Sequence, residues 1–246
     1  MINKIYILLL EILINIFDHS NKKKILKFLK KNFQDKKLLI IDIGSHKGET
    51  IDLFTKNFNL YKIFSFEPNF ELYSNLKKAK KYKNNFIEIN NFGLGEKKGT
   101  KNLNIMRETS SSTYNELNLE SKYYHKKKFI INMFSLSKDL FKKKQSTEII
   151  TLSDFVKMRN IEKIDLLKID TEGYEYNILK GVNLTDLAHI DYIYFEHHYD
   201  LMIKKNYKFS DINNYLKSNN FVKVFKIKMK FRKTFEYIYK NTKNFY

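Results

Sequence analysis

The sequence predicts one α/β domain built on a doubly wound, mostly parallel sheet, with helices on both faces and an antiparallel edge strand. Three observations support this fold class. Short apolar runs of strand length alternate with amphipathic helical segments along most of the chain, as in repeated strand–helix–strand units. Several of these runs end on an acidic residue. The length of 246 residues and the apolar content of 43% are sufficient for one domain with a full core.

The N-terminal residues 1–36 are predicted to form a helical extension. Residues 5–17 are an apolar stretch interrupted by Glu11, and residues 21–33, NKKKILKFLKKNF, repeat apolar residues at helical spacing. The first stretch is shorter than the roughly 20 residues that a membrane-spanning helix needs, and no small-residue cleavage site follows it. We expect helices that pack on the domain; a peripheral contact of residues 5–17 with a membrane surface is the alternative.

Residues 38–94 predict the first βαβαβ unit. The run LLIID, residues 38–42, is typical of a strand buried in a parallel sheet, and a helix follows over residues 49–58. KIFSFE (62–67) is the second strand, ELYSNLKKAKKY (71–82) the next helix and NFIEINNFGL (85–94) the third strand. Such a unit implies right-handed crossovers and a doubly wound sheet.

The regular pattern stops between residues 96 and 146. EKKGTKNLNI (96–105) predicts a hairpin strand, whereas residues 107–146 are polar, rich in lysine and without proline or glycine. A long segment outside the repeating units is commonly a functional loop. We therefore expect residues 107–146 to form a variable cap over the mouth of a site.

Strands and helices resume after residue 146. TEIITLSDFVKM (147–158) predicts a strand and a helix, IDLLKID (164–170) a buried strand, residues 175–181 a helix and IDYIYFEHH (190–198) another strand. A helix over residues 209–220 is followed by two alternating segments, residues 221–228 and 231–240. Alternation of apolar and polar residues predicts half-buried antiparallel strands at one edge of the sheet.

The formal charge is +19, from 46 basic and 27 acidic residues, and by itself it suggests an anionic partner such as nucleic acid, a membrane surface or a charged glycan. We favour solvated lysine faces, because arginine, the residue suited to specific phosphate contacts, is scarce. The absence of cysteine excludes disulfides, thiolate zinc sites and cysteine nucleophiles. A cytoplasmic location is the default expectation.

Acidic residues at the predicted strand ends define the candidate site, because ligands of open α/β sheets bind beyond the carboxyl ends of the strands. The residues at these ends are Asp42, Glu67, Asp170 with Glu172, and Glu196 with His197. A dinucleotide site needs G-x-G-x-x-G after the first strand, but here Asp42 and Lys47 take the first and third glycine positions around Gly44. An acid there would repel a pyrophosphate and attract a ligand with an ammonium and a sulfonium. S-adenosylmethionine is such a ligand.

Glu67 favours the same ligand. It follows the loop glycine by about 20 residues, a separation at which an acid after the second strand hydrogen-bonds the ribose hydroxyls. Pro68, the single proline of the chain, fixes the turn that follows.

These motifs resemble those of the FkbM-type methyltransferases, a family that uses S-adenosylmethionine and mostly methylates hydroxyls of sugars, glycans and polyketides. The resemblance extends over residues 38–198 and rests on DIGSHKG (42–48), FEP (66–68), SSST (110–113), TLSDF (151–155), LLKIDTEGYEYNILKG (166–181) and FEHH (195–198). It implies a Rossmann-like methyltransferase domain over residues 37–246.

The resemblance also implies roles for the loop residues. The methionine part of the cofactor would be held by the loop of Asp42, Gly44, Ser45 and Gly48, and the ribose by Glu67 with Pro68 beside it. Ser45 and His46 stand where the family usually has an Ala-Asn pair.

The second group of site residues is expected next to the transferred methyl group. Lys168, Asp170 and Glu172 alternate in the sequence and would share one face at the end of a strand. We expect Asp170 to be the general base or to anchor the acceptor, with Glu172 orienting a backbone or the acceptor, and Lys168 and Glu196 contacting it. A structural ion-pair network is the alternative. His197 could take a hydroxyl proton or be a histidine of the core edge.

We expect O-methylation of a sugar, a glycan or a related small metabolite. The alternatives are an RNA ribose 2′-O-methyltransferase and a non-catalytic basic binding module on the same fold. The proline-bearing motif of amino-methylating nucleic-acid enzymes cannot occur with proline only at position 68, and the covalent cytosine-C5 route needs a cysteine. Asp170, Glu196 and His197 could bind a divalent cation, but no ligand spacing requires one and none is expected.

Overall fold

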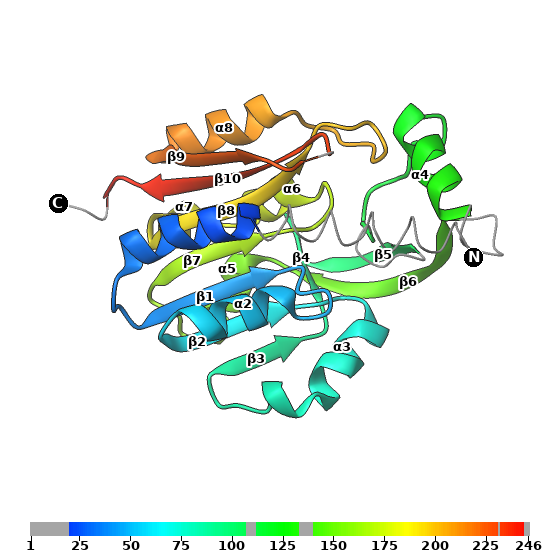
Figure 1. Ribbon diagram of the computed structural model, residues 1–246. Coiled ribbons are helices and arrows are strands. Elements are labelled where there is room, and N and C mark those ends of the chain that lie inside the picture. Colours follow the sequence, from blue (N-terminus) through cyan, green and yellow to red (C-terminus); the bar gives the residue numbers. More distant parts are fainter. Residues whose placement is uncertain (1–19, 107–111, 133–139, 231, 244–246) are drawn as a thin grey trace.

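A computed structural model describes residues 20–106, 112–132, 140–230 and 232–243. The apolar residues 5–17 and part of the predicted cap therefore lie outside the described residues. The remaining chain forms a seven-stranded sheet, a smaller three-stranded sheet and helices around them (Figure 1).

The main sheet has the strand order β3-β2-β1-β7-β8-β10-β9. Its parallel part consists of β1 (Leu38–Ile43), β2 (Leu60–Phe66), β3 (Ile87–Asn90), β7 (Ile164–Ile169) and β8 (Ile190–His198). β10 (Thr234–Asn241) pairs antiparallel with both β8 and the edge strand β9 (Phe221–Lys228). The predicted fold class is confirmed, with the antiparallel strand lying one position inside the edge.

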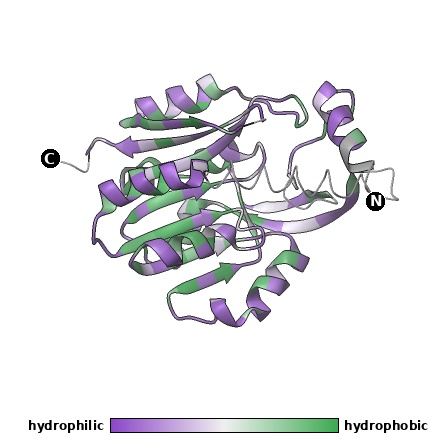
Figure 2. Ribbon diagram, in the orientation of Figure 1, coloured by the Kyte–Doolittle hydropathy of each residue, from purple (hydrophilic) through white to green (hydrophobic). Residues whose placement is uncertain are grey.

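Helices cover both faces of the main sheet. One face packs against α5 (Leu152–Met158), α6 (Glu175–Lys180), α7 (Leu184–Ala188) and α8 (Phe209–Ser218), whose buried residues include Phe155, Ile178, Leu187 and Ile212. The other face packs against α2 (Glu49–Asn57), the helix of residues 20–33 and the segment around α3 (Phe70–Lys78) and η1 (Lys80–Tyr82). The strands between these layers are mostly hydrophobic in Figure 2, as expected for a parallel sheet buried on both sides.

The helix of residues 20–33 is docked on the sheet. Ile25, Leu29 and Phe33 are each at most 4% exposed and belong to the same core cluster as the strands. Just beyond this helix, Lys36 Nζ lies 2.5 Å from Asp165 and 3.2 Å from Asp191, at the amino ends of β7 and β8. None of the described helices combines the length and the apolar character that crossing a bilayer requires.

The smaller sheet has the order β4-β6-β5 and contains β4 (Gly93–Leu94), β5 (Gly99–Met106) and β6 (Phe141–Ile150). Figure 1 shows β5, β6 and α4 (Lys122–Asn132) extending beyond the end of the main sheet where β1 ends. The predicted hairpin strand of residues 96–105 corresponds to β5. The end of the region predicted as a cap is also strand, because β6 begins at Phe141.

Candidate active site

The loop between β1 and α2 is folded tightly against the end of β2. The amides of Gly44 and Ser45 both donate to the Phe66 carbonyl at 3.0 Å, and the Ser45 hydroxyl donates to the same oxygen at 3.2 Å. Gly44 has φ +87°, and a Cβ there would lie 1.9 Å from the Asp170 carbonyl oxygen. The predicted loop thus needs glycine at position 44 for its backbone conformation and for its approach to the end of β7.

Gly48 and Ser45 have supporting positions. Gly48 has φ +89°, directly precedes α2 as its N-cap residue, and accepts a hydrogen bond at its carbonyl from the Tyr82 hydroxyl at 3.2 Å. Both residues lie outside the lining of the cavity described below, whereas Gly44 and His46 belong to it. Their predicted contacts with a cofactor stay predictions; what the structure shows is their part in shaping the loop.

Glu67 joins the loop to the turn after β2. Its two carboxylate oxygens accept the amides of His46 at 2.8 Å and Asn69 at 2.9 Å. Burial raises the pKa of Glu67 to about 7, although these two hydrogen bonds act in the opposite direction. Each oxygen keeps a second acceptor position, and the side chain lines the cavity beside Pro68. The geometry is therefore suited to a ligand that offers two hydroxyl groups.

Asp42 lies behind the loop. Its side chain is fully buried, accepts a hydrogen bond from the Ser65 hydroxyl at 3.3 Å and lies 3.6 Å from Lys168 Nζ. Lys168 also lies 3.2 Å from Asp170, and neither Asp42 nor Lys168 lines the cavity. For Lys168 and Asp170 the structure shows the ion pair that the sequence left as an alternative, and Asp42 lies on the other side of the same ammonium group. Asp42 and Lys168 carry charge beneath the site.

Asp170, Thr171 and Glu172 form a turn that begins where β7 ends at Ile169. The expectation that Lys168, Asp170 and Glu172 alternate along one strand is corrected, because only Lys168 is in the strand. Burial alone would raise the pKa of Asp170, but the adjacent Lys168 ammonium holds it below its ordinary value.

Glu172 has the left-handed φ of +52°, which is uncommon for a residue with a Cβ. Its carbonyl accepts a hydrogen bond from the Thr113 hydroxyl at 2.8 Å, and Asn115 donates to the next carbonyl, that of Gly173. Burial, together with Glu196 and Asp170, raises the pKa of Glu172 to about 8, although His198 lowers it. The backbone at Glu172 is therefore held beside the cavity by contacts from the cap segment.

His197 points to the opposite face from the acids, and its prediction as a catalytic residue is corrected. Its ring is 3% exposed and packs among aromatic rings, with centroid distances of 4.8 Å to Tyr199 and 5.7 Å to Phe209. Burial, followed by the charge of Lys205, lowers its pKa to about 3. His197 is a neutral core histidine in this environment.

His198 is the histidine that faces the acids. Its Nε2 lies 3.3 Å from Glu172 Oε2 and 3.3 Å from Glu196 Oε1, while Nδ1 is 3.5 Å from Asp200. Burial would lower its pKa, but Glu172 and the other carboxylates raise it to about 10. Successive side chains of a strand point to opposite faces. Of the two histidines in FEHH, the second one, His198, therefore faces the site and the first does not.

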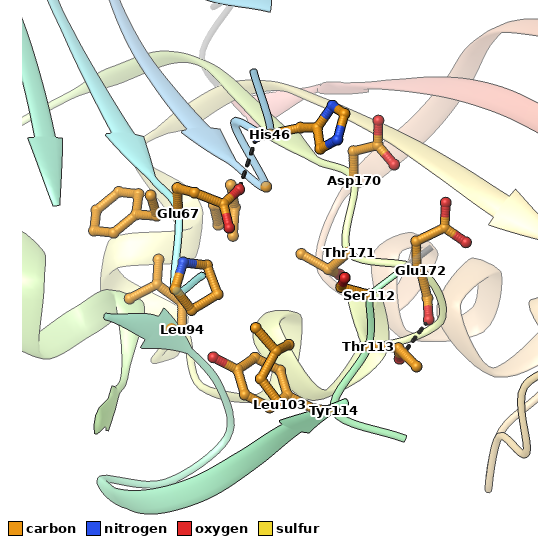
Figure 3. A pocket seen from close by; sticks show the side chains of 15 residues that line it. His46, Glu67, Leu94, Leu103, Ser112, Thr113, Tyr114, Asp170, Thr171 and Glu172 are labelled. Carbon is orange, nitrogen blue, oxygen red and sulfur yellow. Dashed lines mark hydrogen bonds between the residues drawn. The ribbon is translucent and has the colours of Figure 1, made fainter. Parts of the chain in front are cut away.

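A cavity lies between the loop at Gly44, the Glu67 side chain and the turn of Asp170 and Glu172. The empty space within it is about 570 Å³, including the open solvent at its mouth. In Figure 3, Glu67 lies across the cavity from Asp170, Thr171 and Glu172, and the His46 ring lies at one end of the cavity, near Asp170. The remaining wall comes from the small sheet and the cap segment, with Leu94, Leu103, Ser112, Thr113 and Tyr114.

The apolar wall was not predicted from the sequence. Leu94 and Leu103 are ordinary core residues by pattern, and only the fold of the small sheet brings them to the cavity. Ser112 and Thr113 could have been recognised as site residues, because they end the SSST segment that contributes to the family resemblance. Acids on two sides and apolar side chains on a third suit a ligand that combines hydroxyls, a cationic group and a flat apolar ring.

A metal site is not assembled by the described residues. Among them, no three or more histidine and acidic side chains are arranged to hold a metal ion. The grouping considered from the sequence, Asp170 with Glu196 and His197, does not form, because His197 faces the aromatic cluster.

Comparison with known proteins identifies a family. The model described as the methyltransferase FkbM domain matches residues 42–223. A comparison with curated protein sequences found no match.

Solved structures of methyltransferases share the fold. A methyltransferase FkbM from Methylobacillus flagellatus KT has a TM-score of 0.53 and 13% identity, over 83% of this chain and 43% of its own. The magnesium protoporphyrin IX methyltransferase ChlM from Synechocystis PCC 6803 with bound S-adenosylhomocysteine has a TM-score of 0.50 and 10% identity, covering 93% and 85%. The METTL16 methyltransferase domain has a TM-score of 0.50 and 11% identity, covering 91% and 67%. At these identities the likeness concerns the fold alone, and this chain spans less than half of the FkbM structure.

Proposed function

This chain belongs to the FkbM methyltransferase family, and we propose that it transfers a methyl group from S-adenosylmethionine to a hydroxyl of a sugar, a glycan or a related small metabolite. The observation that carries the proposal is the cavity at the carboxyl ends of β1, β2 and β7. It has Glu67 on one side and the turn of Asp170 and Glu172 on the other.

The residues of the cavity fit the cofactor. Glu67 offers two carboxylate oxygens already oriented by backbone amides, and these would hold the ribose diol. Leu94 and Leu103 provide apolar surface for the adenine ring, and the loop at Gly44 would hold the methionine part. When bound, the sulfonium supplies an electrophilic methyl group. The buried acids favour its positive charge.

The turn after β7 is suited to an acceptor hydroxyl. Asp170 is held ionised by Lys168, so it can accept a hydrogen bond from a hydroxyl and align its oxygen. Alignment is the main requirement of this displacement, because the departing thioether is neutral. The concentration of carboxylates also disfavours an acceptor with a phosphate beside the reacting group. These properties support an acceptor hydroxyl that has no phosphate beside it.

The test is transfer of isotope-labelled methyl from S-adenosylmethionine to a panel of methyl glycosides and sugar nucleotides, with an RNA oligonucleotide as a separate arm. We expect label in an O-methyl group of a sugar. Asp170→Asn should bind S-adenosylhomocysteine nearly as well as the parent protein and lose most of the transfer. Label confined to RNA, or unchanged transfer by Asp170→Asn, would contradict the proposal.

A further inference from the structure

We propose that Glu172 is the residue that accepts the proton of the acceptor hydroxyl, and that His198 is the positioning residue that holds its carboxylate for this role. The inference rests on the proposed methyl transfer to a hydroxyl and deepens it. It gives Asp170 the anchoring role and assigns a function to a histidine that the sequence motif alone did not distinguish from its neighbour.

His198 lies at the centre of a buried cluster of acids. His198 is held between Glu172 and Glu196, at 3.3 Å from each, and its other ring nitrogen faces Asp200 at 3.5 Å and the Thr234 hydroxyl at 3.1 Å. All three charged partners are largely buried, with side chains at most 16% exposed. Of these residues only Glu172 lines the cavity. Glu172 is therefore the member of the cluster that belongs to the cavity wall.

The two acids at the cavity, Asp170 and Glu172, have different cationic partners. Asp170 is compensated by the Lys168 ammonium at 3.2 Å, which makes it a weak base. Glu172 has no lysine at that distance in the described residues; it shares His198 with a second carboxylate, that of Glu196. A general base works best when its pKa is close to the working pH. Glu172 is therefore better suited to this step than Asp170, whose pKa is held low by Lys168.

The backbone of Glu172 has an uncommon conformation. Glu172 is held in a left-handed conformation by hydrogen bonds from Thr113 and, at the next residue, from Asn115. Strained non-glycine residues that persist in a fold are concentrated at functional sites. Since both contacts come from the segment that also lines the cavity, the cap holds the backbone of Glu172 and Gly173 beside the cavity.

Other charged and titratable groups act on Glu172 from each surrounding element, and they enter its proton affinity. They are Asp170 after β7, Glu196 and His198 on β8, Tyr123 and Lys127 on α4, and Lys205 in the segment after β8, while Asp200 acts on His198. Within this set His198 is the nearest cation, so its removal is expected to have the largest effect.

The proton and electron balance of the step is complete without another reactant. The acceptor oxygen forms its new bond to the methyl carbon as its O–H bond breaks, and that proton moves to a Glu172 carboxylate oxygen. The electron pair of the broken C–S bond remains on sulfur, which becomes neutral. The cluster afterwards carries one more proton, which it can release to water at the mouth.

The first experiment measures the histidine ring by NMR in the full ¹⁵N-labelled chain, over a pH series with S-adenosylhomocysteine present. His198 should stay an imidazolium well above the pH at which an unperturbed histidine titrates, and His198→Gln assigns its signal. Glu172→Gln should lower the His198 midpoint by about one pH unit or more, because a neighbouring opposite charge is lost. Glu116→Gln, an exposed acid on the same segment as Asn115, should leave it unchanged.

The second experiment uses an acceptor found with the sugar panel. Glu172→Gln should reduce kcat by about 10²- to 10⁴-fold, the usual contribution of a general base. His198→Gln should reduce kcat at pH 7 and recover part of it at higher pH, because loss of the imidazolium raises the pKa of Glu172. In a plot of kcat against pH, His197→Gln should leave the acid limb, where kcat falls as the pH drops, at the same pH. If His198 had a purely structural role, His198→Gln would also leave this limb unmoved.

The outcomes separate the two proposals. If the parent protein fails to bind S-adenosylhomocysteine, the proposed function is wrong. If it binds but the His198 midpoint does not respond to Glu172→Gln, or if Glu172→Gln retains full kcat, the assignment of Glu172 is overturned while the methyltransferase function stands. A His198→Gln profile with an unmoved acid limb would overturn the positioning role.

Discussion

Replacing Glu67 by glutamine tests the cofactor site with the smallest change of shape. In the structure the two carboxylate oxygens of Glu67 accept the amides of His46 and Asn69 at 2.8 and 2.9 Å. Glutamine has one oxygen and one NH₂ group, so one of these amides would face another donor. The substitution thus removes the negative charge and half of the acceptor positions while keeping the volume.

The magnitude follows from the hydrogen bonds to a ribose diol. Hydrogen bonds to a charged group contribute about 1.5 to 3 kcal/mol and neutral ones about 0.5 to 1.5 kcal/mol. Loss of the charge and of one acceptor should therefore weaken cofactor binding by about 1 to 3 kcal/mol, or about 5- to 150-fold in Kd. Glu67→Ala should fall in the same range or above it.

The assay is calorimetric titration with S-adenosylhomocysteine. The matched control is Glu71→Gln, an exposed acid paired with Lys142 at 2.9 Å, which should bind like the parent protein. Because burial raises the pKa of Glu67 to about 7, affinity of the parent should also fall as the pH drops below that value, whereas Glu67→Gln should lack this dependence. A folded Glu67→Gln variant with unchanged affinity would refute the ribose assignment.

Three further predictions concern stability and the loop. The unliganded protein should have a higher Tm at pH 6.5 than at pH 8.5. Acids whose pKa is raised bind protons in the folded state that the unfolded chain has lost, which changes the free energy of unfolding by about 1.4 kcal/mol per proton and pH unit. These acids include Glu67, Glu172, Glu196 and Glu236. The raised pKa of His198 acts in the same direction, Glu236→Gln should flatten the slope, and a Tm that rises with pH would contradict the buried-acid account. Gly44→Ala should abolish S-adenosylhomocysteine binding in calorimetry, because its Cβ would lie 1.9 Å from the Asp170 carbonyl; retained affinity would show that the loop can move. Leu29→Ala should lower the free energy of unfolding by about 2 to 5 kcal/mol in denaturant titrations, against little change for the exposed Lys30→Ala, and equal stability of the two variants would mean that the helix of residues 20–33 does not dock in solution.

The parallel strands β1, β2 and β7, and the positions of Gly44 and Glu67 just beyond strand ends, were predictable because they follow from local patterns. Apolar runs bounded by acids identified β1, β2 and β7, and parallel pairing brings their carboxyl ends together whatever the loops contain. Glu67 and Gly44 were found by their positions relative to these ends. Both line the cavity in the structure.

The choice between His197 and His198 could not be made from the sequence. Two adjacent residues of a strand point to opposite faces. Which of the two faces the site depends on the length of β8 and on its pairing with β10. In the structure, His198 pairs with Thr234 and His197 with Phe235, which brings His197 to an aromatic cluster. A one-residue difference in register would exchange these environments.

The turn after β7 and the apolar wall also depend on tertiary structure. The alternation expected for Lys168, Asp170 and Glu172 fails because β7 ends at Ile169 and Glu172 takes a left-handed conformation under contacts from the cap. Leu103 comes from the small sheet, and an apolar residue carries no chemical signal of its own. Long-range packing, not local propensity, decides both features.

The central claim is that the cavity between Glu67 and Asp170 holds S-adenosylmethionine. The most direct measurement is calorimetric titration of the purified full chain with S-adenosylhomocysteine in the presence of EDTA. We predict saturable one-site binding in the micromolar range that is unaffected by the chelator. Absence of binding in a correctly folded sample would contradict the account and return the basic binding module to consideration.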